Sequence, residues 1–172
     1  MTTATVRTVN VVHELRDGYF HRTAIDKRPV SGPVAVGPLG LTGDEQVDRS
    51  HGGRDRAVYV YADEDAAWWS EQLGRDIPPG RFGENLRTTG LDVTGARIGE
   101  QWRVGAMCRV RTEGEVRAGD PVHRLNWPSH PVTIGALASG SVTAEQMREL
   151  LDSGVALTTS VRNQATRMVS AS

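Results

Sequence analysis

Two residue types that carry much of protein chemistry are almost missing from this sequence. Cys108 is the only cysteine among the 172 residues, so the chain can form neither an internal disulfide nor a zinc site made of several cysteines. Lys27 is the only lysine, and arginine supplies nearly all of the positive charge. Arginine suits two-point binding of phosphate and carboxylate groups, but a GC-rich genome is the simpler explanation of this bias.

Signals of several protein classes are also absent. No apolar run approaches the ~18 residues of a membrane span, and the first residues lack the basic start and apolar core of a signal peptide. The net charge of −1 argues against a nucleic-acid-binding protein, which usually carries a basic excess. There is no P-loop, nucleophile elbow, dinucleotide-binding fingerprint or iron–sulfur cysteine set. We therefore expect a cytoplasmic protein that binds neither nucleic acid nor a membrane.

Short strands separated by glycine turns dominate the first 140 residues. Residues rich in β-branched side chains predict strands at 6–13 and 56–62, and the second is apolar enough to be buried on both faces. Further strands are expected at 96–105, 107–116 and 120–125. Strands this short, with turns this frequent, favour a mainly β fold with a closed or nearly closed β-barrel over a parallel α/β sheet.

One helix is expected between these strands. Asp63 can cap its beginning, and Gly74 can end it. Ala66, Trp69 and Leu73 recur at helical spacing, so we expect them to share one apolar face.

The sequence changes character after about residue 140. Thr143 followed by Gln146 predicts a capping box at the start of a helix. A second apolar stripe has helical spacing and consists of Val161, Ala165 and Met168. We therefore predict a β-barrel domain over residues 1–140 and a helical segment over 141–172 that packs on the barrel.

The first stretch that could carry chemistry is "GDEQVDRSHGGRDRAVYVY", residues 43–61. Paired glycines, Gly52 and Gly53, allow backbone N–H groups to approach an anion. His51 and Arg54 could add donors to a phosphate or carboxylate. The alternative is a hairpin loop with a solvated histidine.

The second stretch is "PPGRFGENLRTTGL", residues 78–91. Gly83 permits a backbone geometry closed to other residues, and Phe82 can anchor the loop in the core. Glu84 and Asn85 would then project in a fixed direction, where a carboxylate beside an amide can bind the edge of a pterin or purine. The alternative is an Asx-type turn in which Asn85 bonds its own backbone.

The two stretches together, in this order, resemble the MOSC family, named after the C-terminal domain of molybdenum cofactor sulfurases. The resemblance is carried by Gly-Asp-x-Gln-x-Asp, by His-Gly-Gly before an apolar strand, and by Phe-Gly-Glu-Asn-Leu followed by Gly-Leu and Ile-Gly. "TAIDKRPVSGPVAVGPLGL" (23–41) and "EGEVRAGDPV" (113–122) are also similar to segments of the family, and the helical end is similar to the tails of small stand-alone bacterial members.

The resemblance implies a β-barrel-centred fold that binds the molybdenum cofactor, a molybdopterin, and acts in sulfur transfer or in reduction of N-oxygenated substrates. It implies a cofactor pocket with two walls, formed by His51, Gly52, Gly53 and Arg54, and by Phe82, Gly83, Glu84 and Asn85. Since the chain has no iron–sulfur or dinucleotide motif, an electron donor would be a separate protein.

One family feature has no match here. In the family, a Pro-Arg-x-Pro-Cys-type motif carries the proposed metal or sulfur ligand, but "RIGEQWRVG" runs directly into "AMCRVRTEGEVRAGDPV". The family's cysteine role is therefore not assigned to Cys108, and no catalytic residue and no metal ligand is predicted. Cys108 is more simply read as a small apolar residue on a strand.

Three hypotheses remain open from the sequence. The protein is a MOSC-type enzyme, or it is a non-catalytic module that binds the pterin cofactor or another anionic heterocycle. As a third possibility, it is a degenerate relative in which the missing segment leaves an unpaired sheet edge, which predicts a homodimer or poor solubility.

Overall fold

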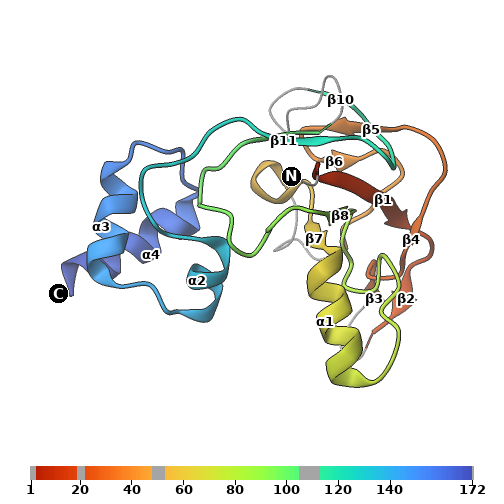
Figure 1. Ribbon diagram of the computed structural model, residues 1–172, viewed down its shortest axis with the longest axis horizontal. Coiled ribbons are helices and arrows are strands. Elements are labelled where there is room, and N and C mark those ends of the chain that lie inside the picture. Colours follow the sequence, from red (N-terminus) through yellow and green to blue (C-terminus); the bar gives the residue numbers. More distant parts are fainter. Residues whose placement is uncertain (1–2, 19–21, 48–52, 105–112, 172) are drawn as a thin grey trace. The chain divides into compact units, whose positions relative to one another are not determined.

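The computed structural model describes residues 3–18, 22–47, 53–104 and 113–171 (Figure 1). Among the residues described, no helix is long and apolar enough to cross a membrane.

The chain divides into two compact units. The first comprises Met1–Leu91 and Arg103–His123, and the second comprises Asp92–Trp102 and Arg124–Ser172. The expected domain boundary at residue 140 stays a prediction, while residues 124–140 belong by their contacts to the helical unit.

Short strands make up most of the regular structure of the first unit. The strands are β1 (Thr5–Val12), β2 (Arg16–Asp17), β3 (Arg22–Thr23), β4 (Lys27–Pro29), β5 (Val34–Gly37), β6 (Gly40–Leu41), β7 (Val60–Ala62), β8 (Leu86–Thr89), β9 (Trp102–Val104), β10 (Gly114–Val116) and β11 (Val122–Arg124). The helices of the described residues, in both units, are the 3-10 helix η1 (Arg54–Arg56) and the α-helices α1 (Asp63–Leu73), α2 (Ile134–Ser139), α3 (Ala144–Asp152) and α4 (Thr159–Ser170).

The central sheet of the first unit has the strand order β4-β1-β8-β7. Strand β1 pairs antiparallel with both β4 and β8. Its side chains Val6 and Val9 are almost fully buried, as is Leu86 on β8, so this sheet carries the hydrophobic core of the unit. The strand predicted at 6–13 is thereby confirmed.

Strand β7 differs from the prediction for residues 56–62. It covers only Val60–Ala62, lies at the edge of the central sheet, and pairs in parallel with β8 after the α1 crossover. Because it is an edge strand, the expected burial on both faces is wrong for the preceding Tyr59, whose side chain is 47% exposed.

The remaining strands form smaller sheets. They have the orders β10-β5-β6, β11-β9 and β2-β3, so the fold is mainly β with a few helices. Within the described ranges these sheets do not join into a closed barrel, and the barrel expected from strand and turn frequency stays a prediction. The strands expected at 96–105 and 120–125 are present but shorter, as β9 and β11.

Helix α1 ends as predicted and begins one residue earlier than predicted, with Ala62 as its cap. Gly74 adopts a left-handed conformation with φ 59° and caps the C-terminus. Asp63 is the first helical residue rather than the cap, since its carboxylate pairs with Arg7 and Arg87. Of the predicted apolar face only Ala66 is buried, and Trp69 is 40% exposed.

The second unit has its own small core. Its buried side chains are Val132, Val142, Met147, Leu150 and Ala165. The capping box of Thr143 and Gln146 is confirmed at the start of α3, and the Val161 stripe lies on α4 as expected. Helix α2 was not predicted, because its six residues are too few to show a helical period.

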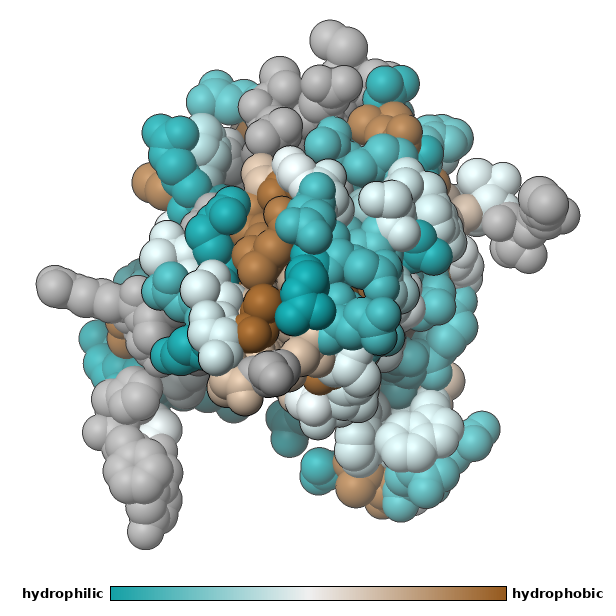
Figure 2. Space-filling view, turned by 90° about the vertical axis from the view of Figure 1, so that its left-hand side faces the viewer, coloured by the Kyte–Doolittle hydropathy of each residue, from teal (hydrophilic) through white to brown (hydrophobic). Residues whose placement is uncertain are grey.

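Many hydrophobic residues around this core are only partly buried. Figure 2, which faces the helical end of the chain, shows a stripe of hydrophobic surface between hydrophilic residues.

Candidate functional site

Two backbone turns fold the loop before β8 tightly. The Arg81 N–H donates to the Pro78 carbonyl at 3.2 Å, and the Gly83 N–H donates to the Gly80 carbonyl at 3.0 Å. Gly80 has a φ of 85°, which glycine adopts without steric cost. A Cβ at Gly80 would also lie 2.1 Å from the carbonyl oxygen of Lys27, so only glycine lets this loop pack against β4.

Glu84 lies inside the loop and is fully buried. Its Oε1 accepts a hydrogen bond from the Gly80 N–H at 2.8 Å, and its Oε2 accepts one from the Phe82 N–H at 3.0 Å. Arg87 donates to Oε1 through Nε at 2.8 Å and approaches the same oxygen with a terminal nitrogen at 2.5 Å. The carboxylate therefore fixes the loop and neutralises Arg87.

Arg87 is the matching buried cation, with 1% of its residue surface exposed. Besides Glu84 it contacts the Pro78 carbonyl at 3.2 Å and the Asp63 carboxylate at 3.4 Å. Its guanidinium carbon lies 5.6 Å from the centroid of the Tyr61 ring. The Arg87 guanidinium thus has polar partners and an aromatic ring around it. A buried charge needs such partners, because it has lost its contacts with water.

Asn85 joins the two stretches identified from the sequence. Its Oδ1 accepts a hydrogen bond from the Tyr59 N–H at 3.0 Å. Its Nδ2 donates to Asp44 Oδ2 at 2.7 Å and to the Asn10 carbonyl at 3.4 Å. Since Tyr59 and Asp44 belong to the first stretch and Asn85 to the second, one amide side chain connects both to β1.

Asp44 is also the partner of the single lysine. Lys27 Nζ lies 2.7 Å from Asp44 Oδ2, and the side chains of this pair are 8% and 3% exposed. The other carboxylate oxygen, Oδ1, accepts a hydrogen bond from the Val12 N–H at 3.0 Å. Three segments that resemble MOSC sequences therefore meet at Asp44, through Lys27, Asp44 itself and Asn85.

An aromatic cluster lies beside the buried ion pair. The rings of Tyr61 and Phe82 have centroids 4.7 Å apart, and those of Tyr59 and Tyr61 are 6.2 Å apart. Burial raises the pKa of the Tyr59 phenol, and the neighbouring Tyr61 and Glu84 raise it further. Burial likewise raises the pKa of Tyr61, with the charge of Asp65 adding to the effect.

The first predicted wall is described only from Gly53 onwards. Gly53 has a φ of 72° and precedes η1, and both it and Arg54 are exposed. His51 and Gly52 lie outside the described residues, as does Cys108.

The second predicted wall is described completely. Phe82 and Gly83 are half-buried, whereas Glu84 and Asn85 are buried and use their polar atoms on protein partners. Cofactor binding by any of these residues stays a prediction. The alternative was an Asx-type turn, in which the Asn85 side chain bonds its own backbone. The Asn85 side chain instead forms hydrogen bonds with Tyr59, Asp44 and Asn10.

Sequence reasoning missed several residues that hold this region together. They are Asn10, Lys27, Asp44 and Arg87. Asp44 lies in the Gly-Asp-x-Gln-x-Asp pattern, and Lys27 is unique in the sequence, so both carried a signal. Asn10 and Arg87 are polar residues in strand segments, and nothing in the sequence marked them as structurally important.

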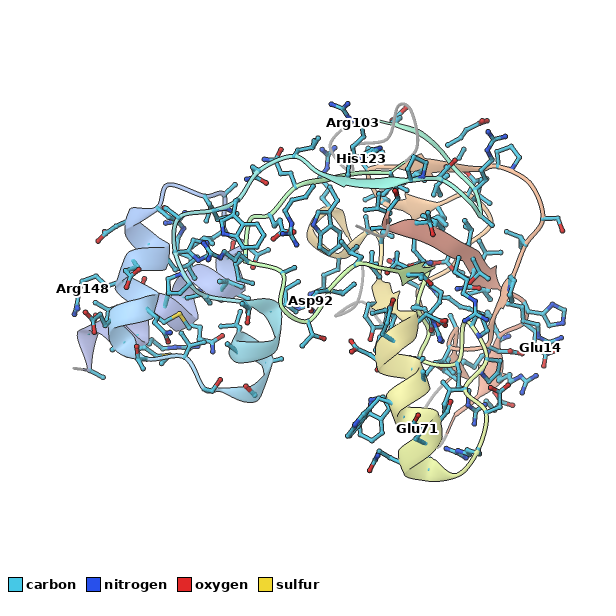
Figure 3. All side chains as sticks on the ribbon, in the orientation of Figure 1. Glu14, Glu71, Asp92, Arg103, His123 and Arg148 are labelled. Carbon is cyan, nitrogen blue, oxygen red and sulfur yellow. The ribbon has the colours of Figure 1, made fainter. Side chains whose placement is uncertain are left out.

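Two further histidines lie elsewhere in the chain. His130 is 1% exposed, and both ring nitrogens contact main-chain groups, at Ile98 and Val132. His123 is exposed on β11 (Figure 3). Within the part of the chain that the structure describes, no group of three or more potential metal-ligating side chains occurs.

Comparison with known proteins identifies the family. The family model of the MOSC domain matches residues 47–107. Residues 47–107 of this chain thus match the MOSC domain. The matched segment contains both Tyr59 and Asn85, so the hydrogen bond between these two residues lies within it.

Two curated relatives of this chain are informative. Protein YiiM of Escherichia coli is 36% identical over 111 residues, covering 61% of this chain and 47% of the relative. A protein named reductase, from Gibberella moniliformis, is 35% identical over 90 residues, covering 48% of this chain and 15% of the relative. The chain therefore spans less than half the length of these relatives.

The fold of this chain is also found in a solved structure. The crystal structure of YiiM from Geobacillus stearothermophilus superimposes with a TM-score of 0.72 at 21% identity, covering 96% of this chain and 98% of that one. The likeness shows a shared fold.

Proposed function

We propose that this protein binds the molybdenum cofactor and acts in reduction of N-oxygenated substrates or in sulfur transfer. The observation that carries the proposal is the junction at Asp44 and Asn85, which draws the two family-like stretches together. The relative named reductase favours the reductive reaction. Cytoplasmic location and a separate electron-donor protein are parts of the same proposal.

The described residues would serve a pterin with an anionic side chain in two roles, some by positioning the loop and others by contacting the cofactor. Glu84 and Asn85 are buried and engaged, so they position the loop rather than contact the cofactor directly. Contact would come from the exposed Gly53 main chain, from Arg54, and from Tyr59. Arg54 suits an anionic group, and Tyr59, next to Tyr61 and Phe82, suits a planar ring.

A buried acceptor without a partner lies beside the same loop. Asn10 donates through Nδ2 to the Glu84 carbonyl at 3.3 Å, while its Oδ1 is buried and has no hydrogen-bond partner among the residues described. A buried acceptor without a partner is costly, and a donor from outside the protein would satisfy it. When bound, the cofactor would supply the redox or sulfur chemistry, whereas the chain's own residues would orient it.

The test is the cofactor content of protein purified from a host that makes the molybdenum cofactor. We expect near-stoichiometric molybdenum by elemental analysis, together with a fluorescent pterin after oxidation. Arg54→Gln and Phe82→Ala should lower the pterin content, while Arg148→Gln, at an exposed position of α3, should not. Absence of both molybdenum and pterin in the unaltered protein would contradict the proposal.

A second candidate is a module that binds the pterin without catalysis. It is favoured by the absence of a Pro-Arg-x-Pro-Cys segment, which in the family carries the proposed metal or sulfur ligand. Cys108→Ala separates the two. It should abolish turnover and spare pterin binding if Cys108 has taken over that role, whereas pterin without molybdenum or turnover in the unaltered protein supports the module.

A further inference from the structure

Two arginines and a tryptophan form a cluster in the second unit that the proposed function does not use. The guanidinium carbon of Arg124 lies 4.2 Å from the centroid of the Trp127 ring, and that of Arg97 lies 4.7 Å from it. Trp127 is 57% exposed, more than Trp68 at 53%. We call these three residues the Trp127 cluster.

Neighbouring groups hold both arginines in place. A terminal nitrogen of Arg97 donates to the Pro128 carbonyl at 2.6 Å. Arg124 Nε donates to Glu100 Oε1 at 2.5 Å. Because each guanidinium is fixed before any ligand arrives, little conformational entropy would be lost on binding.

The segment that carries Trp127 is fixed as well. Asn126 Oδ1 accepts a hydrogen bond from the Gln101 N–H at 2.6 Å, and Asn126 Nδ2 donates to the Gly99 carbonyl at 3.3 Å. The indole is therefore presented by an ordered loop while more than half of the residue's surface faces water.

The cluster carries excess positive charge. Its one paired carboxylate, Glu100, has a side chain that is only 2% exposed, and it also accepts a hydrogen bond from Trp102 Nε1 at 2.5 Å. Among the described residues, no carboxylate forms an ion pair with the Arg97 guanidinium. A guanidinium has five N–H donors, and one donor on each arginine is used within the described part of the protein.

These features together define a ligand chemistry. Guanidinium donors bind phosphate oxygens in pairs, and here two guanidinium groups lie near the centroid of one ring, at 4.7 and 4.2 Å. An exposed indole at the same place offers an apolar surface to a planar ring. We propose that the Trp127 cluster binds a small phosphomonoester that carries a planar ring, the chemistry of a nucleoside monophosphate.

The experiment is titration calorimetry of the full chain with adenosine monophosphate, beside inorganic phosphate and adenosine as separate probes. We expect saturable binding of adenosine monophosphate that exceeds binding of either fragment by at least about tenfold. Arg97→Gln and Trp127→Leu should each weaken it by about tenfold or more. If Arg97→Gln does not fold, Arg97→Lys tests the same point, since lysine keeps the charge and loses the paired donors and the stacking.

The matched control is Arg148→Gln. Arg148 lies on α3 of the same unit and its side chain is exposed (Figure 3), so its removal lowers the net charge equally without touching the cluster. The proposal is overturned if no saturable binding occurs at millimolar probe, or if Arg148→Gln weakens binding as much as Arg97→Gln. Equal binding of phosphate alone, or of adenosine alone, would also overturn it.

This inference and the proposed function fail separately. The titration concerns residues of the second unit and needs no cofactor, whereas the molybdenum and pterin contents concern the first unit.

Discussion

The Asn85 amide and the Asp44 carboxylate meet inside the first unit, with Nδ2 donating to Oδ2 at 2.7 Å. The opposite end of the same amide accepts the Tyr59 N–H. Only a side chain with a donor at one end and an acceptor at the other satisfies both partners, and in this length only asparagine provides that. The position is thus specified by its hydrogen bonds rather than by its size.

Asn85→Asp should destabilise the protein in a pH-dependent way. The introduced carboxyl would face the carboxylate of Asp44 in place of a donor. Like charge raises the pKa of the introduced group in the fold above its unfolded value of about 3.9. Its contribution to stability is therefore retained below that value and lost as pH rises. Urea unfolding across the acid to neutral range should show the deficit relative to the unaltered protein growing with pH, and a deficit that shrinks as pH rises would contradict this.

Lys27 should be chemically protected by the fold. Its side chain is 8% exposed and held by Asp44 at 2.7 Å. An acylating reagent should therefore modify Lys27 only when the structure opens, at a rate that follows the open population. Mass spectrometry of the Lys27 peptide checks this, with a free lysine derivative in the same solution as the reference amine. Acylation of folded protein as fast as the reference would show that the pair is not buried.

Removing one partner of the Glu84–Arg87 pair should be costly. Arg87→Met leaves the Glu84 carboxylate buried without its cation, which destabilises proteins by about 3–5 kcal/mol. The same substitution at Arg117, 68% exposed and 3.5 Å from Asp120, should cost no more than about 1 kcal/mol. Denaturant unfolding of the two variants measures the difference, and equal losses would show that the buried pair contributes no more than a surface pair.

The Tyr59 phenol should lose its proton at a higher pH than an ordinary tyrosine. Burial and the neighbouring Tyr61 and Glu84 raise its pKa in the fold, above the usual value of about 10. A raised folded-state pKa means that this stabilisation is intact below about pH 10 and is lost as pH rises beyond it. Near-ultraviolet absorbance titration of the unaltered protein and of Tyr59→Phe should differ by one phenol that titrates above pH 10. A difference centred at or below 10 would refute the assignment.

Local patterns predicted the helical parts of this chain well. The Thr143 capping box, the Gly74 end of α1 and the stripe on α4 all depend on residues within one or two turns of each other. Such short-range interactions can be read from a sequence, and the same holds for strand β1 with its run of β-branched residues.

The arrangement of the strands could not be read in the same way. The parallel pairing of β7 with β8 and the edge position of β7 depend on contacts between distant segments. Tyr59 therefore looked like a buried strand residue and is half-exposed. Short strands carry too little pattern to reveal which neighbour they pair with.

The candidate site stays a prediction, and the structure shows contacts for its polar residues that the sequence did not reveal. Glu84 and Asn85 were singled out as polar groups that project towards a ligand, and they are buried and bonded within the protein. Nothing local distinguishes a projecting carboxylate from a buried one, because the difference lies in Arg87 and in the turn N–H groups around it. Asp44 and Lys27 became significant only once the fold had placed them together.

The central claim is that Asn85 is a structural junction of the MOSC domain, so it matters even without cofactor. The direct measurement is the free energy of unfolding of Asn85→Ala made in a host that cannot synthesise the cofactor, with Asn163→Ala on exposed α4 as the control. We expect a loss of at least about 2 kcal/mol, because the Tyr59 N–H and the Asp44 carboxylate lose a buried partner. Stability equal to the unaltered cofactor-free protein, with only pterin binding lost, would contradict the claim and make Asn85 a ligand of the cofactor instead.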